Sequence, residues 1–162
     1  MKLKNNTLNS YSDDDFSLVS WDEHYSTRIL LIDNQHQELV RITNELFDAC
    51  RAGNDKAVSA FKELIPHMVD YVKFHFKTEQ DLMERINYPE CKSHLVQHDE
   101  LIRDILAAAK DFDDGKKFVP NRFSRTLKAW ILSHVAVYDK AYALFALDQK
   151  RKGLLTDEQL EG

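Results

Sequence analysis

The chain has 162 residues, of which 43% are hydrophobic and 30% are charged, and its formal net charge is -5. This composition excludes a disordered chain, and an acidic balance without a long basic run argues against nucleic acid as a partner. No apolar run approaches the roughly 18 residues of a membrane span, and the first residues lack a secretory signal, so we expect a cytoplasmic protein that does not span a membrane.

The order of segments along the chain predicts one helical domain between two short terminal segments. Residues 1–15 are polar and aperiodic, which indicates a flexible N-terminal arm. Residues 16–149 are expected to form the domain, within which 16–32 packs irregularly against the helices. Residues 150–162 are expected to be a mobile C-terminal tail.

Four segments of the domain repeat apolar residues at the period of an α-helix. Asp33 is predicted to cap the first helix, Gly53 to end it, and Asn121 to cap the fourth. Because the turns between the helices are short, the sequence predicts an all-α, up-down-up-down antiparallel four-helix bundle. The expected helices span about 33–52, 56–86, 91–112 and 121–149.

Potential metal ligands lie on the inward faces of all four predicted helices. A single inward histidine is usually a hydrogen-bonded structural residue, and the spacing His94-x-x-x-His98 alone could equally be a surface pair or half of a zinc site. The full set is different, because each buried polar group without a partner costs about 1–3 kcal/mol and a metal can satisfy all of them together. The candidate ligands are His36, His75, Glu79, His94, His98, His134 and Asp139.

The number of candidate ligands favours two metal ions over one. A tetrahedral zinc site needs four ligands and would leave three of these side chains over. If Glu79 and Asp139 bridge two six-coordinate ions, then five imidazoles, the two carboxylates and a bridging oxide or hydroxide fill all but one position. An open position on a redox metal can accept a small ligand such as O2. A centre with more imidazole than carboxylate is expected to hold O2 rather than cleave it.

Asp139 is the candidate ligand whose position is hardest to explain on a regular helix. It follows His134 by five residues, which on an ideal α-helix places it about 140° around the axis. Either the side chain reaches across, or the backbone is distorted locally, as in a π-bulge at a functional site.

The motifs together resemble those of bacterial hemerythrins, over roughly residues 16–148. The resemblance lies in their order and spacing as well as in the residues themselves. The matching segments are Ile32-Asp33-Asn34-Gln35-His36, His75-Phe76-Lys77-Thr78-Glu79 with Leu82-Met83 and Tyr88-Pro89, His94-Leu95-Val96-Gln97-His98, and Trp130-Ile131-Leu132-Ser133-His134 leading to Asp139-Lys140.

The resemblance implies a role for each candidate ligand. It implies two iron ions joined by an oxide or hydroxide bridge, with O2 as the exogenous ligand. One iron would be held by His94, His98 and His134, the second by His36 and His75, and both by Glu79 and Asp139. Ile131 would line a dry O2 pocket beside the second iron. His24 and His67 fall outside the motifs and are expected not to be ligands.

The leading functional hypothesis is reversible O2 binding, for storage or for delivery to an oxygen-using protein partner. On this hypothesis the protein is a monomer and not an enzyme. Two alternatives remain open at this point: a di-iron scavenger that consumes peroxide or nitric oxide, and an O2 or redox sensor.

Overall fold

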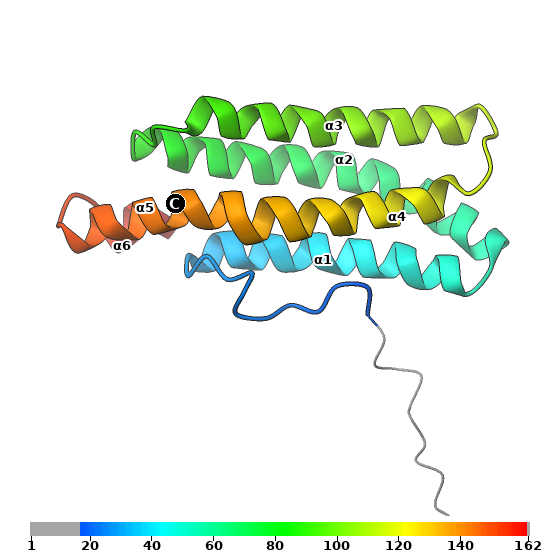
Figure 1. The fold of residues 1–162 in the computed structure, drawn as a ribbon, viewed down its shortest axis with the longest axis horizontal. Coiled ribbons are helices and arrows are strands. Elements are labelled where there is room, and N and C mark those ends of the chain that lie inside the picture. Colours follow the sequence, from blue (N-terminus) through cyan, green and yellow to red (C-terminus); the bar gives the residue numbers. More distant parts are fainter. Residues whose placement is uncertain (1–16, 162) are drawn as a thin grey trace, which may run out of the picture.

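Four helical rods pack side by side in the computed structural model, which describes residues 17–161 (Figure 1). The predicted arm at 1–15 lies outside these residues. The fourth rod is composite, because a π-helix joins two α-helices end to end. The rods are α1 (Leu30–Arg51), α2 (Asn54–Arg85), α3 (Cys91–Asp113), and the run of α4 (Val119–Trp130), η2 (Ile131–Asp139) and α5 (Lys140–Arg151).

The rods contact one another as neighbours around a bundle. Helix α1 packs against α2 and α4, and α3 packs against α2 and α4. The connections between rods are short, so successive rods run in opposite directions. The described residues contain no β-strand. The predicted four-helix architecture is therefore confirmed.

The interior consists of two apolar layers with a polar layer between them. One apolar cluster includes Leu46, Phe61 and Phe123, towards the end of the bundle where α1 joins α2. The other includes Ile32 and Tyr142, towards the opposite end. On α1 and on the fourth rod the candidate ligands fall between residues of these two clusters in sequence, and on α2 Glu79 does so. Burial of apolar side chains on both sides therefore holds the polar layer in place.

Two predicted helix caps are wrong. Helix α1 begins at Leu30, so Asp33 lies inside it and its carboxylate instead accepts hydrogen bonds from the Thr27 amide and hydroxyl, both at 2.7 Å. Helix α4 begins at Val119, preceded by Phe118 in a left-handed conformation, so Asn121 does not cap it. In both cases the chain enters the helix earlier than the polar residue suggests.

The C-terminal segment contains a helix that the sequence analysis does not predict. A short helix, α6 (Asp157–Glu161), follows α5, and Leu160 is buried in the apolar cluster formed by α1, α2 and α5. Leu155 also packs against this cluster, and Arg85 donates a hydrogen bond to the Gln159 carbonyl. Part of the predicted tail is therefore helical and packed, and its mobility stays a prediction. None of the helices in residues 17–161 is long and apolar enough to cross a membrane.

Candidate metal centre

The seven predicted ligands converge in the polar layer of the bundle. Helix α1 supplies His36, α2 supplies His75 and Glu79, α3 supplies His94 and His98, and η2 supplies His134 and Asp139. All are buried, with at most 3% of any residue exposed. Their donor atoms form two groups in which each atom lies within 4.8 Å of the others. The groups are Glu79, His94, His98, His134 and Asp139, and His36, His75, Glu79 and Asp139.

The π-helix explains how Asp139 reaches this centre. Segment η2 spans Ile131–Asp139, and the hydrogen bonds of a π-helix join residues five apart. Residues 134 and 139 therefore share a face that a regular α-helix would not give them. The result is a distance of 3.1 Å between His134 Nε2 and Asp139 Oδ1. Of the two explanations that the sequence leaves open, the local distortion is the one found.

The three imidazoles of the larger group have the spacing of ligands on one ion. His98 Nε2 lies 3.0 Å from His94 Nε2 and 3.1 Å from His134 Nε2. Two nitrogens bound to one ion through bonds of about 2.1 Å lie about 3.0–3.4 Å apart, depending on the coordination geometry. Both spacings fall in this range, so the three rings can share one ion.

Glu79 and Asp139 lie between the two groups of imidazoles. Glu79 Oε2 is 3.0 Å from His98 Nε2 and 3.7 Å from His75 Nε2, so one carboxylate faces both groups. Asp139 Oδ1 is 3.3 Å from His94 Nε2, while its Oδ2 is 3.1 Å from His36 Nε2. Each carboxylate therefore offers oxygen to both sides, which is the placement that a bridging ligand needs.

Several donor atoms of the centre lack a hydrogen-bond partner. Within residues 17–161, every buried side-chain nitrogen or oxygen that makes no hydrogen bond belongs to a predicted ligand. An unsatisfied buried group costs about 1–3 kcal/mol, and more when charged, so a native core does not normally concentrate them. A bound cation would satisfy those atoms that face the centre. The atoms are His36 Nδ1 and Nε2, His75 Nε2, Glu79 Oε2, His98 Nδ1, and Asp139 Oδ1 and Oδ2.

The electrostatics of the centre keep both carboxylates charged. Burial by itself would raise the pKa of both carboxyls, and the charge of Glu79 would raise that of Asp139 further. The surrounding imidazoles outweigh these effects and hold the pKa of both carboxyls below the usual range. Burial opposes charge on His36 as well, yet Asp139 and Glu79 outweigh it and raise the pKa of His36 to about 9. At His75 burial dominates and lowers the pKa to about 4. Two anionic side chains and a neutral imidazole are thus available to a cation.

Two glutamines orient imidazoles of the centre, and the sequence analysis missed them. Gln35 Oε1 accepts a hydrogen bond of 2.9 Å from His75 Nδ1, and Gln97 Oε1 accepts one of 3.0 Å from His134 Nδ1. Each bond leaves the Nε2 atom of the ring free to face the centre. Each glutamine directly precedes a predicted ligand in sequence but contacts a ligand on another helix. That position beside an inward histidine is the signal that could have identified them.

Tyr142 makes the corresponding contact to a carboxylate. Its hydroxyl donates a hydrogen bond of 2.7 Å to Glu79 Oε1, and the residue is fully buried. This bond occupies Oε1 of Glu79 and thereby fixes the direction of Oε2, the oxygen that has no hydrogen-bond partner. The sequence analysis did not place Tyr142 among the inward residues of the fourth helix, so its role is visible only in three dimensions.

Ile131 lies in apolar surroundings, as expected for the dry pocket predicted from the sequence. The role of this pocket in O2 binding stays a prediction. Ile131 is 2% exposed and packs in an apolar cluster with Val19, Tyr25, Val40 and Val135. The ring of Trp21, which also packs against this cluster, lies 6.2 Å from the ring of His36. Apolar side chains therefore cover the His36 side of the centre.

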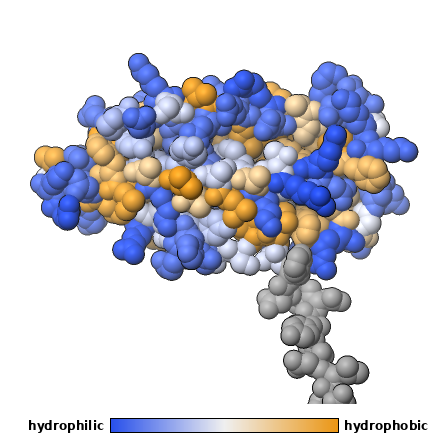
Figure 2. Space-filling view, viewed as in Figure 1, coloured by the Kyte–Doolittle hydropathy of each residue, from blue (hydrophilic) through white to orange (hydrophobic). Residues whose placement is uncertain are grey.

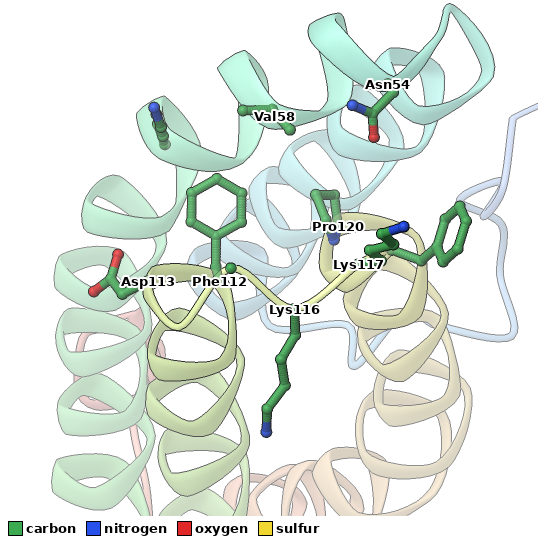
Figure 3. Close-up of a pocket in the computed structure, with 10 residues that line it drawn as sticks. Asn54, Val58, Phe112, Asp113, Lys116, Lys117 and Pro120 are labelled. Atoms are coloured by element: carbon green, nitrogen blue, oxygen red, sulfur yellow. The ribbon is translucent and has the colours of Figure 1, made fainter.

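The remaining histidines and one surface cavity lie away from the centre. His24 and His67 are exposed, and neither belongs to a group of potential ligands. A cavity of about 720 Å³ lies at the turns joining α1 to α2 and α3 to α4, where Phe112 points towards Val58 (Figure 3). None of the predicted ligands lines it.

Comparisons with known proteins all find similarity to hemerythrins. The Hemerythrin HHE cation binding domain family matches residues 27–144. A bacteriohemerythrin of Methylococcus capsulatus is 27% identical over 127 residues, covering 78% of this chain and 95% of the relative. A bacteriohemerythrin of Pseudomonas aeruginosa is 33% identical over 122 residues, covering 75% and 77%. A crystal structure of wild-type hemerythrin superposes with a TM-score of 0.68 at 28% identity, covering 79% of this chain and 97% of that one.

Proposed function

Because the chain belongs to the hemerythrin HHE cation-binding family, we propose that its buried centre holds two iron ions and binds O2 reversibly. The protein would store O2 or deliver it to an oxygen-using partner, and would not act as an enzyme. The observation that carries this proposal is the pair of donor groups that share Glu79 and Asp139. A single ion would leave part of this set unused.

The proposed ligand assignment follows the two donor groups. His94, His98 and His134 would hold one iron, His36 and His75 the other, and Glu79 and Asp139 would bridge them together with an oxide or hydroxide. The iron pair, when bound, supplies two electrons and one open coordination position for O2. The orphaned atoms and the spacing of the three Nε2 atoms support this fit.

The protein side chains would favour carriage over consumption of O2. Imidazole donors are neutral and outnumber the two carboxylates, whereas di-iron enzymes of ferritin-like bundles are richer in carboxylate. Trp21, Ile131 and Val135 exclude water from the His36 side, which limits proton delivery to a bound ligand. The described residues place no further carboxylate or thiol among the groups that contact the centre.

The test of this proposal is the iron content together with the visible spectrum. We expect about two iron atoms per chain, and a charge-transfer band that appears when O2 is added to the reduced protein and disappears when O2 is removed. A single zinc, or irreversible oxidation without an oxygenated form, would contradict the proposal. Steady consumption of peroxide or nitric oxide would favour the scavenger alternative.

The two glutamines give a prediction about the strength of metal binding. Replacing Gln35 or Gln97 by Leu removes the acceptor that fixes the ring of His75 or His134, so we expect iron affinity to fall about 10–100-fold. Competition with a chromophoric chelator measures this affinity. The matched control is Gln37→Leu, because Gln37 is exposed on the same helix as Gln35. Equal affinities for Gln35→Leu and Gln37→Leu would contradict the orienting role.

A further inference from the structure

Residues 17–29 form a strap without regular secondary structure that runs along the outside of α1 (Figure 1). Its first attachment is to Asn44 on α1. The Asn44 side-chain oxygen accepts a hydrogen bond of 2.9 Å from the Val19 amide, and its side-chain nitrogen donates one of 2.8 Å to the Val19 carbonyl. Asn44 therefore binds both backbone groups of one strap residue, as a neighbouring β-strand would.

A second attachment lies on the other side of Trp21. The ammonium group of Lys140 donates hydrogen bonds to the carbonyls of Glu23 at 3.3 Å and His24 at 2.7 Å. Lys140 directly follows Asp139, a predicted ligand. The stretch from Val19 to His24 is thus tied at each end, to α1 at one and to α5 at the other.

Trp21 occupies the middle of this tied stretch and faces the centre. Its ring stacks on the ring of Tyr25 at 5.7 Å and lies 6.2 Å from the ring of His36. The strap residue Val19 is buried in the same apolar cluster as Ile131 and Val40. The strap is therefore the outer wall of the apolar compartment beside His36, and the bundle helices form its inner wall.

This wall is held more weakly than the bundle that it covers. The strap makes no continuous backbone ladder with the helices, and its middle depends on the ties at Asn44 and Lys140. Val19 and Tyr25 are buried and Asp33 holds Thr27, but the residues between Val19 and Tyr25 are exposed or half-buried. A loop stretch of this kind opens locally at lower free energy than the whole fold. Local opening of this stretch would uncover the His36 side of the centre. Figure 2 shows hydrophilic residues mainly around the rim of the viewed face, with hydrophobic residues scattered across its middle.

We propose that Asn44 is a positioning residue that keeps the strap closed over the His36 side of the centre, and that it thereby sets how fast water and small ligands reach the centre. This inference rests on the proposed function, because it assumes a metal site behind the strap. Asn44 touches none of the predicted ligands, so its effect would be on access and not on the coordination itself.

The experiment uses the full-length iron-loaded protein and the variants Asn44→Asp and Asn44→Ala. Asn44→Asp keeps the size and the acceptor but loses the donor to the Val19 carbonyl, whereas Asn44→Ala loses both. The matched control is Asn34→Ala, since Asn34 is exposed on the same helix. Two quantities are measured: amide hydrogen exchange over residues 18–25, and the association rate of azide, a small anion that binds ferric iron.

We expect Asn44→Ala to speed both amide exchange and azide association by about 5- to 150-fold, which is the factor by which the loss of two ordinary hydrogen bonds shifts an opening equilibrium. The spectrum of the azide complex should not change, the melting temperature should fall by only a few degrees, and Asn34→Ala should match the wild type. If Asn44 only stabilised the fold, its replacement would not raise the association rate of azide while leaving the spectrum of the azide complex unchanged.

Two results would overturn the inference. If exchange in the strap is unchanged, Asn44 does not hold it closed. If exchange rises and azide association does not, the strap is not the route of access. A wild-type protein without iron would instead contradict the proposed function, and the exchange data would then still decide whether Asn44 holds the strap.

Discussion

Removing the metal should lower the melting temperature of the protein by about 10 °C or more. A ligand present at about a thousand times its dissociation constant stabilises the folded state by about 4 kcal/mol, and 1 kcal/mol shifts the melting temperature of a domain of this size by about 2–4 °C. The structural reason is the set of orphaned atoms on His36, His75, Glu79 and Asp139, which lose their shared partner when the metal leaves.

The measurement is thermal unfolding followed by circular dichroism, before and after exhaustive chelation and after iron is added back. Re-addition of iron should restore the original transition, which separates metal loss from damage. A useful control is the Glu79→Gln variant, in which the chelator should produce little shift because the shared donor is already missing. Superimposable curves for the treated and untreated wild type would mean that these side chains do not form a metal site.

Much of the bundle and the grouping of the candidate ligands could be predicted from local sequence patterns. His75 and Glu79, like His94 and His98, lie four residues apart, and this spacing alone places each pair on one helix face. Inward stripes on four helices then require the pairs to meet in the interior. The same reasoning identified Asp139 as an exception, and the π-helix η2 is the backbone change that places it beside His134.

Contacts between distant segments could not be predicted in this way. The bond from His75 to Gln35 joins residues 40 positions apart, and the tie from Asn44 to Val19 joins residues 25 apart. Each depends on the relative rotation of packed elements, which hydrophobic periodicity does not specify. The prediction that Asp33 caps the first helix is wrong for a related reason, because its carboxylate accepts a hydrogen bond from the Thr27 amide instead of capping the helix.

Replacing the shared carboxylate should remove more iron than replacing any single histidine. Glu79→Gln keeps the shape of the side chain and an oxygen for the Tyr142 hydroxyl, but it removes the charge and one of the two oxygens. Since Glu79 belongs to both donor groups, both proposed iron sites weaken together. We expect the iron content to fall from about two atoms per chain to well below one, with loss of the oxygenated spectrum.

Single-histidine variants provide the comparison that makes this result specific. His75 belongs only to the smaller donor group, so His75→Gln should leave the group around His94, His98 and His134 able to retain about one metal ion. Glu63→Gln is the matched control for charge, because Glu63 is exposed on the same helix as Glu79. Iron determined by plasma emission, combined with a melting curve for each variant, distinguishes loss of metal from loss of fold. If Glu79→Gln retained as much iron as Glu63→Gln, the carboxylate would not be shared between two ions, and the centre would have to be built on the imidazoles alone.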